Sequence, residues 1–281
     1  MALDPLITTE ALAERLSDPR VRPVDASWWF PHEGRDAPAE FEAGHIPGAV
    51  FFDIDAIADR TSDLPHMLPS PEAFAAAVGA LGLGDQATIV IYEAGAPRAA
   101  ARAWWMFRVM GHEDVLVLDG GLPKWRSEGR SIQTGRSTPA PTAFTPRFNP
   151  ALVRNAADIR HVLQDGSAQI ADARPGARFR GEAAEPRAGL KSGHMPGAVS
   201  LPASDFFAAD GTLLPPEALQ GRLSAVELDL TSPVISSCGS GITACTLALA
   251  AARLGHWDVA VYDGSWAEWG ALPEAPVVTS A

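Results

Sequence analysis

The amino-acid sequence predicts an α/β fold built from two tandem, similar domains, each with a mainly parallel sheet flanked by helices. Two observations lead to this prediction. The 281-residue chain repeats several motifs in the same order in its two halves. Each half also alternates short apolar runs, typical of buried strands, with longer helical segments. With a hydrophobic content of 47%, a chain of this length can give two domains their own packed cores.

The repeat consists of four pairs of segments that follow one another in the same order. A single match could arise from convergent turn chemistry, but four matches in order indicate a tandem duplication. The pairs are 24–26 and 171–173 (VDA, ADA), 44–50 and 193–199 (GHIPGAV, GHMPGAV), 111–112 and 255–256 (GH in both), and 118–125 and 262–269 (LDGGLPKW, YDGSWAEW).

The duplication divides the chain into a first domain at 1–130, a linker at 131–153 and a second domain at 154–281. The linker is rich in Pro, Ser and Thr and has no apolar period, so it should be extended. We expect Phe144 and Phe148 to hold the linker against the surface of the protein rather than leave it free.

The alternation of strands and helices indicates where a site should lie. Continuous apolar runs at 87–94 and 232–238 are typical of central parallel strands. The helical segments that follow them, 97–111 and 242–255, each end in a glycine, which suits the position just after a helix. Ligands of such sheets bind outside the carboxyl ends of the strands, so the segment after 232–238 is the candidate site. Further strands are expected within 21–29, 114–121, 168–174 and 258–265.

The bulk composition excludes several classes of function. A net charge of −12 argues against binding to nucleic acid, and equally against an anionic membrane surface. The two cysteines cannot form a disulfide framework, and their spacing is not that of metal ligands, which favours a reducing, cytoplasmic setting. The first residues lack the basic and apolar regions of a signal peptide. No window approaches 18 consecutive apolar residues, so no membrane span is expected.

Cys238 stands at the start of a small-residue loop within the segment SSCGSGITAC, 236–245. Glycines on both sides of Ser240 permit a tight turn. Successive N–H groups can then converge on one point, and the following helix adds the partial positive charge of its N-terminus. Such a loop stabilises a thiolate and holds an anion attached to it. The residues expected to form this cradle are Gly239, Ser240, Gly241, Ile242 and Thr243.

The alternatives for this loop are weaker. Cys238 could be a buried cysteine beside a flexible turn, but the glycines would then serve no purpose. The sixth residue after Cys238 is Ala244 and no arginine follows before Arg253, so the bidentate phosphate clamp of a cysteine phosphatase is missing. Cys245 lies among small apolar residues and is interpreted as a core residue, with a redox partner as the alternative. In the first domain the repeat places Ala94 opposite Cys238, so that domain lacks the nucleophile.

Several motifs resemble those of the tandem rhodanese-domain sulfurtransferases, and they extend over almost the whole chain. The loop CGSGIT is similar to the 3-mercaptopyruvate branch, with Ile242 where valine is commoner. The thiosulfate branch tends to carry a basic pair after the cysteine. The motifs that carry the resemblance are GHIPGAVFFDID, HMLPSPEAF, RAWWMFR, LDGGLPKW, GHMPGAV, CGSGIT and YDGSWAEW.

The resemblance implies a mechanism without a metal or organic cofactor. The Cys238 thiolate would attack the sulfur of 3-mercaptopyruvate, release pyruvate and keep a persulfide. A thiol acceptor such as thioredoxin, or cyanide, would then take the outer sulfur. In this branch two arginines nine residues apart hold the substrate, and Arg178 and Arg187 have that spacing.

The family also implies a proton relay from a serine of the loop to a histidine and an aspartate of the first domain. Ser240 matches the serine, and His45 and Asp36 are the candidates for the other two groups. Histidine is the natural proton carrier near neutral pH. Because His45 has a counterpart in His194, a structural role in bracing the turn remains open for it, and Asp36 could equally be an exposed loop charge.

Two other functions remain as alternatives to the 3-mercaptopyruvate sulfurtransferase. A thiosulfate:cyanide sulfurtransferase would use the same chemistry, but the missing basic pair counts against it, because a doubly charged donor favours nearby cations. A non-enzymatic sulfur-carrier or redox-sensing module would bind a protein partner and turn over little. The presence of both Arg178 and Arg187 argues against that module.

Overall fold

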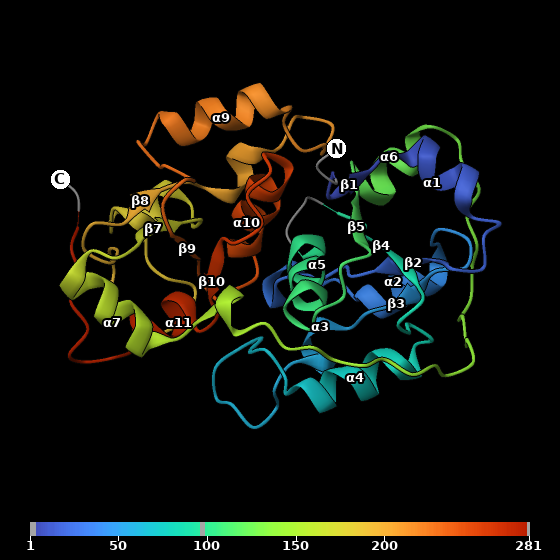
Figure 1. The fold of residues 1–281 in the computed structure, drawn as a ribbon, viewed down its shortest axis with the longest axis horizontal. Helices are drawn as coiled ribbons and strands as arrows, with labels where there is room; N and C mark the ends of the chain where they lie inside the picture. The colour runs from blue at the N-terminus through green and yellow to red at the C-terminus, as the bar shows by residue number, and fades with distance from the viewer. Residues whose placement is uncertain (1–3, 96–98, 280–281) are drawn as a thin grey trace.

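Each half of the chain forms a five-stranded, wholly parallel sheet in the computed structural model, which describes residues 4–95 and 99–279. The first sheet has the order β1-β5-β4-β2-β3 and the second the order β6-β10-β9-β7-β8, so the two topologies are the same (Figure 1). This confirms the predicted fold class. The strands are β1 (Leu6–Ile7), β2 (Val21–Asp25), β3 (Val50–Phe51), β4 (Thr88–Tyr92), β5 (Val115–Leu118), β6 (Val153–Arg154), β7 (Gln169–Asp172), β8 (Val199–Ser200), β9 (Val234–Ser237) and β10 (Ala260–Tyr262).

Helices cover the two sheets. The helical segments predicted from the sequence are α5 and α10, and the glycine after each has a positive φ, +80° at Gly111 and +92° at Gly255, as expected just past a helix end. The helices are α1 (Thr9–Arg15), α2 (Ala37–Ala43), α3 (Ile54–Ile57), α4 (Pro71–Ala80), α5 (Ala100–Val109), α6 (Gly121–Ser127), α7 (Ala156–Asp165), α8 (Gly176–Phe179), α9 (Pro216–Ser224), α10 (Ala244–Arg253) and α11 (Ser265–Trp269).

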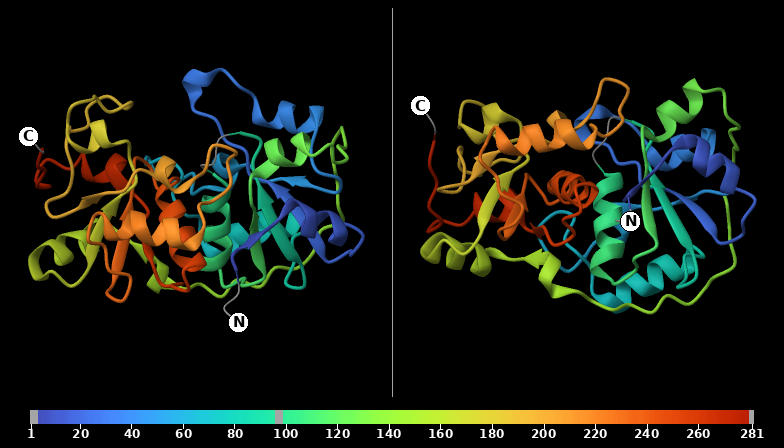
Figure 2. Two further views of the ribbon diagram at one scale, coloured as in Figure 1. Left: turned by 90° about the horizontal axis from the view of Figure 1, so that it is seen from above. Right: turned by 45° about the horizontal axis from the view of Figure 1, so that its top comes forward.

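The two domains meet where α5 packs against α10, near the middle of the molecule (Figures 1 and 2). Every residue of α5 except Arg108 is buried, and so is every residue of α10 except Arg253. The rings of Trp104 and Trp257 lie 6.2 Å apart across this contact. A single hydrophobic cluster therefore runs through both domains, because a helix that is apolar all round must be covered on all sides.

The linker runs along the surface of the first domain and past α4 (Figure 1). Its backbone is held there by hydrogen bonds such as that from the N–H of Arg147 to the carbonyl of Met110, 2.8 Å. Phe144 is 8% exposed and packs its ring against Phe74 and Phe107. The ring of Phe148 is 43% exposed, so only one of the two predicted anchors is buried.

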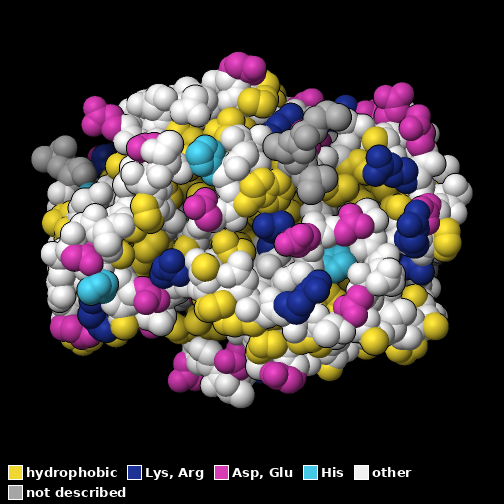
Figure 3. Space-filling model, viewed as in Figure 1, with side chains coloured by type: hydrophobic (Ala, Val, Ile, Leu, Met, Phe, Trp, Pro, Cys, Tyr) yellow, Lys and Arg dark blue, Asp and Glu magenta, His cyan; other side chains and the backbone are white. Residues whose placement is uncertain are grey.

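The surface carries acidic and basic side chains side by side. Asp and Glu alternate with Lys and Arg on the face shown in Figure 3, so the net negative charge does not gather into one block there. Within residues 4–95 and 99–279, no helix is long and apolar enough to cross a membrane.

The linker generates a stability prediction. Phe144→Ala should lower the free energy of unfolding by about 3 kcal/mol, because it removes a buried ring and leaves a cavity. Phe148→Ala is the matched control and should change it by less than about 0.5 kcal/mol, as exposed positions do. Urea denaturation followed by circular dichroism measures both. Equal effects of the two substitutions would show that the linker is not anchored through Phe144.

Candidate active site

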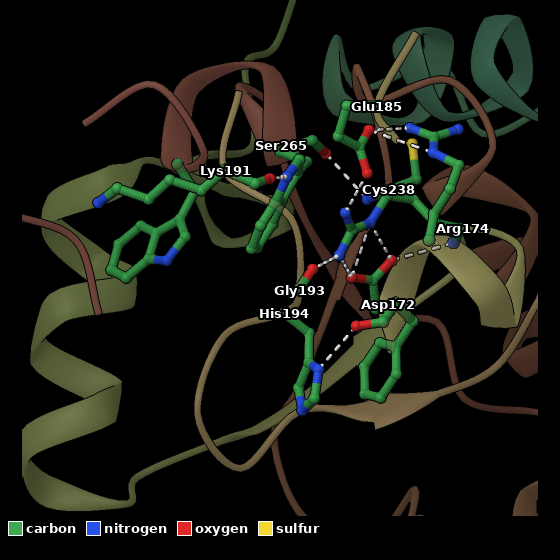
Figure 4. Close-up of polar contacts among 12 residues, drawn as sticks. Asp172, Arg174, Glu185, Lys191, Gly193, His194, Cys238 and Ser265 are labelled. Atoms are coloured by element: carbon green, nitrogen blue, oxygen red, sulfur yellow. Dashed lines mark hydrogen bonds and ion pairs between the residues drawn. The ribbon is translucent and has the colours of Figure 1, made fainter. Parts of the chain in front are cut away.

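The loop that begins with Cys238 joins β9 to α10 and is fastened to the start of α11. The N–H of Cys238 donates to the hydroxyl of Ser265 at 3.0 Å, and Figure 4 shows these two residues side by side. The carbonyl of Cys238 accepts the N–H of Trp266, and that of Gly239 accepts the N–H of Ala267, each at 2.9 Å. Three hydrogen bonds therefore hold the start of the loop at the carboxyl end of the second sheet.

The two glycines of the loop are required for different reasons. Gly241 has a φ of +77°, and a Cβ there would lie 2.6 Å from the carbonyl oxygen of Asp263. Gly239 does not use a left-handed conformation, contrary to what its place beside the turn suggested. A Cβ on Gly239 would instead lie 3.2 Å from Nη2 of Arg178, so this glycine leaves room for a guanidinium beside the thiol.

The loop presents unused hydrogen-bond donors. Among the residues that the structure describes, the backbone N–H groups of 239–243 have no acceptor in the chain. Thr243 is the N-cap of α10 and its side chain makes no capping bond. The side chain of Ile242 is 3% exposed and belongs to the core, so Ile242 offers the site only its backbone. Unpaired donors at the start of a helix are what the predicted anion cradle requires.

Arg178 is held beside the loop by a chain of buried ion pairs. Both Nε and Nη2 of Arg178 donate to one carboxylate oxygen of Glu185, Nε at 3.1 Å. The other oxygen accepts Nη1 of Arg174 at 2.7 Å, and Arg174 pairs in turn with Asp172 at 2.6 Å. Figure 4 shows Arg174 between the two carboxylates. Because Glu185 and Arg174 are almost wholly buried, their geometry is rigid, and it sets the position of Arg178.

Arg187 is coupled electrostatically to this cluster of charges. Partial burial and then the positive charge of Arg178 lower the pKa of Arg187, while the carboxylates of Glu185 and Asp55 oppose that shift. Of the two arginines predicted to bind substrate, Arg178 is the one with a contact at the cysteine loop, where it lies against Gly239.

The predicted relay through His45 and Asp36 does not assemble at the loop. His45 is fully buried, donates from Nδ1 to the carbonyl of Phe41 at 2.8 Å and stacks its ring on that of Phe41 at 4.0 Å. His194 makes the same two contacts with Phe179 in the second domain. Asp36 caps α2 by accepting a backbone N–H of its first turn at 3.1 Å. The structural alternative stated for His45 therefore describes its contacts, and Asp36 is an exposed charge that caps a helix.

A different histidine and aspartate of the first domain form a pair. Nδ1 of His66 donates to Asp55 at 2.6 Å, and the other oxygen of Asp55 accepts the indole N–H of Trp28 at 2.9 Å. The hydrogen bond from His66 is the main cause that holds the pKa of Asp55 below its usual range. Nε2 of His66 is buried and has no partner among the described residues. Arg102 links this pair to the cysteine loop, because it donates to the carbonyl of His66 at 2.6 Å and to the carbonyl of Gly241 at 3.3 Å.

The comparison of the two halves distinguishes His66 from the two histidines that recur. His45 recurs as His194 and His112 recurs as His256, but His66 has no counterpart in the second half. A residue shared by both halves serves the common fold, whereas chemistry that belongs to one cleft needs an unshared residue. His66 also has a φ of +60°, which is unusual for a residue with a side chain.

Cys245 is a core residue, as the sequence indicated. It is fully buried, and its Sγ lies 3.3 Å from the carbonyl oxygen of Gly241 beneath the loop. Burial raises the pKa of the Cys245 thiol to about 12. A thiol in this state is neither a nucleophile nor a redox partner at neutral pH.

In the first domain a carboxylate of the chain itself lies at the start of α5. Ala94 stands where the repeat aligns it with Cys238, so no thiol is present. The carboxylate of Glu93 accepts the N–H groups of Ala99 at 3.1 Å and Ala100 at 3.2 Å. A side-chain anion therefore occupies the start of α5, whereas the start of α10 is left for a substrate.

Fold and loop together define a tandem α/β protein whose second domain carries a cysteine at the carboxyl end of its sheet, in a loop that Arg102 of the first domain contacts. Residues 8–128 and 155–272 each match the rhodanese-like domain. The chain belongs to the rhodanese-like family.

Relatives and solved structures match along nearly the whole chain. The human 3-mercaptopyruvate sulfurtransferase is 44% identical over 270 residues, which cover 94% of this chain and 91% of the human protein. The mitochondrial thiosulfate/3-mercaptopyruvate sulfurtransferase 1 of Arabidopsis thaliana is 42% identical over 295 residues, 98% of this chain and 78% of the plant protein. A crystal structure of SseA from Escherichia coli, described as a 3-mercaptopyruvate sulfotransferase, superimposes with a TM-score of 0.86. The two sequences are 39% identical, and the match covers 95% of this chain and 100% of SseA.

Proposed function

We propose that this protein is a 3-mercaptopyruvate sulfurtransferase that carries sulfur on Cys238. The observation that supports this most is the loop itself, in which the thiol, the unused N–H groups of 239–243 and the guanidinium of Arg178 converge. The relatives named above act, by their names, on 3-mercaptopyruvate, and one of them on thiosulfate as well.

Substrate binding is assigned to Arg178 and Arg187. 3-Mercaptopyruvate has a carboxylate and a keto oxygen, and two guanidinium groups nine residues apart suit these acceptors. A substrate bound through these two acceptors would present its sulfur to the thiol of Cys238, because Arg178 lies against Gly239. Glu185 neutralises part of the charge of Arg178, so the free site is not left with two unbalanced cations.

The sulfur transfer needs one proton. The Cys238 thiolate attacks the substrate sulfur, and the carbon–sulfur bond breaks with its electron pair left on the pyruvate enolate. Ser240 supplies the proton that converts this enolate to pyruvate, and His66 with Asp55 restores it. Because Nδ1 of His66 donates to Asp55, Nε2 remains for proton transfer. Cys238 is left as a persulfide, and the N–H groups of 239–243 stabilise its outer sulfur.

The second half-reaction delivers the sulfur to an acceptor. A small thiol, a thioredoxin or cyanide attacks the outer sulfur and leaves Cys238 as the thiolate. We assign this work to a reducing compartment, the cytoplasm, because the catalytic thiol and a thiol acceptor must both stay reduced. No group beyond the chain's own side chains is required in either step.

Thiosulfate is the second candidate donor. Two arginines near Cys238 can attract a dianion, and the Arabidopsis relative carries both donors in its name. The loop itself offers no cation after Cys238, because Gly239 and Ser240 are neutral. Thiosulfate should therefore react more slowly.

The choice of donor is tested by steady-state sulfur transfer to cyanide. We expect kcat/KM for 3-mercaptopyruvate to exceed that for thiosulfate by more than tenfold, and Cys238→Ser to abolish both reactions. Faster transfer from thiosulfate would make the second candidate the function. No transfer from either donor would indicate a sulfur-carrier or redox-sensing module that acts on a protein partner.

The substrate arginines are tested against a neighbour of the same type. Arg178→Met or Arg187→Met should lower kcat/KM for 3-mercaptopyruvate by about 10- to 100-fold, because each removes a charged hydrogen bond worth roughly 1.5–3 kcal/mol. Arg180→Met is the control, since Arg180 pairs with Glu182 at the surface. Loss of activity in the control, or none in the other two variants, would contradict the assignment.

The proton relay is tested by a pair of histidines. His66→Gln should lower kcat for 3-mercaptopyruvate by about 10²- to 10⁴-fold, the range for general acid–base groups, with little change in Tm. His45→Gln should lower Tm, because the buried ring braces a turn, and leave kcat of the folded enzyme unchanged. The reverse pattern would restore the relay predicted from the sequence. Pyruvate release and differential scanning fluorimetry provide the two measurements.

A further inference from the structure

One arginine of the first domain reaches across the interface to the cysteine loop of the second. Arg102 lies on α5 and is fully buried. Its Nη2 donates to the carbonyl of His66 at 2.6 Å, and its Nη1 donates to the carbonyl of Gly241 at 3.3 Å. Nη1 also pairs with the carboxylate of Asp263 at 2.7 Å. The guanidinium of Arg102 therefore contacts three places at once: the backbone of His66, the cysteine loop at Gly241, and Asp263 just after β10.

Asp263 completes this connection from the second domain. Asp263 is 4% exposed. The carboxylate oxygen that does not pair with Arg102 accepts the N–H of Leu68 at 2.8 Å. The segment 66–68 is thus held at both ends, by Arg102 on one carbonyl and by Asp263 on one N–H. Asp263 also lies against Gly241 and shortly before Ser265, which fastens Cys238.

The backbone at His66 needs such a restraint. A φ of +60° is disfavoured for a residue with a side chain, and it persists where the surroundings determine it. Arg102 restrains the His66 carbonyl, Asp55 restrains the ring at Nδ1, and Trp28 packs edge-on against the ring at 5.0 Å. These contacts leave Nε2 as the free ring nitrogen.

We infer that the Arg102–Asp263 ion pair is a positioning device that sets His66 against the cysteine loop across the domain interface. Arg102 is not a catalytic residue, because it reaches His66 only through a backbone carbonyl. The first domain has no nucleophile of its own, but it would still be required for proton delivery. The inference rests on the proposed function, because the proposed function is what assigns proton transfer to His66.

The inference predicts a donor-dependent defect. With 3-mercaptopyruvate the leaving group is an enolate that must gain a proton. With thiosulfate the Cys238 thiolate attacks the outer sulfur, the sulfur–sulfur bond breaks, and sulfite leaves with the electron pair and needs no proton. Misplacing His66 should therefore slow the first donor more than the second.

The test is a double-mutant cycle between Arg102→Lys and His66→Gln, measured as pyruvate release from 3-mercaptopyruvate with cyanide as acceptor. Lysine keeps the charge that Asp263 needs but cannot bridge two carbonyls. We expect Arg102→Lys to lower kcat at least tenfold in the wild-type background and less than twofold in the His66→Gln background, because a positioning residue has nothing left to position there. Arg108→Lys is the matched control on α5, and it should leave kcat unchanged.

The outcomes separate this inference from the proposed function. A wild-type enzyme that releases no pyruvate would end the proposed function. With an active wild type, equal losses in both backgrounds, or a folded Arg102→Lys of full activity, would overturn the inference alone. Where the wild type also uses thiosulfate, a smaller loss with that donor supports the inference and an equal loss opposes it. Should Arg102→Lys not fold, Asp263→Asn replaces it in the cycle, since it removes the charge and keeps an oxygen for Leu68.

Discussion

The packing of α5 against α10 is the constraint on which the site depends. Both helices are buried on almost every side, and they belong to one hydrophobic cluster that extends into both sheets. Separating the domains would expose this apolar surface to water, which is strongly unfavourable. The position of one domain relative to the other is therefore fixed. A side chain of one domain can therefore form a direct hydrogen bond with a group of the other domain.

Duplication followed by divergence explains how the chemistry is divided between the domains. The second domain carries Cys238 and the two arginines proposed to bind substrate, Arg178 and Arg187. The first domain has Ala94 in place of the thiol and closes the start of α5 with Glu93. It contributes instead the unshared His66 with its partner Asp55. Each half retains the same sheet, yet a complete site exists only where the two are packed together.

Charge in the site is almost entirely paired before substrate arrives. Arg178 shares a buried carboxylate with Arg174, and that network continues to Asp172. Buried ions that lack partners are strongly destabilising, so these pairs allow guanidinium groups to lie in a closed cleft. Within the part of the chain that the structure describes, the backbone N–H groups of 239–243 have no acceptor. An incoming anion therefore finds its hydrogen bonds already oriented, and little reorganisation is needed.

The sequence by itself determined the features that lie within one segment. Apolar runs located β2, β4, β5, β7, β9 and β10 and the helices α5 and α10, and the glycines after those two helices marked their ends. The short strands β1, β3, β6 and β8 were not predicted. The order of residues from Cys238 to Thr243 predicted an anion cradle, because a strand end, a tight turn and a helix start are adjacent in the chain. Only the tertiary structure decided which histidine is linked to that loop. The conspicuous His45 serves a turn that both domains share, whereas the backbone of His66 is joined to the cysteine loop through Arg102 of α5. Pairing between residues on different domains depends on how the helices pack, and no local pattern encodes that distance.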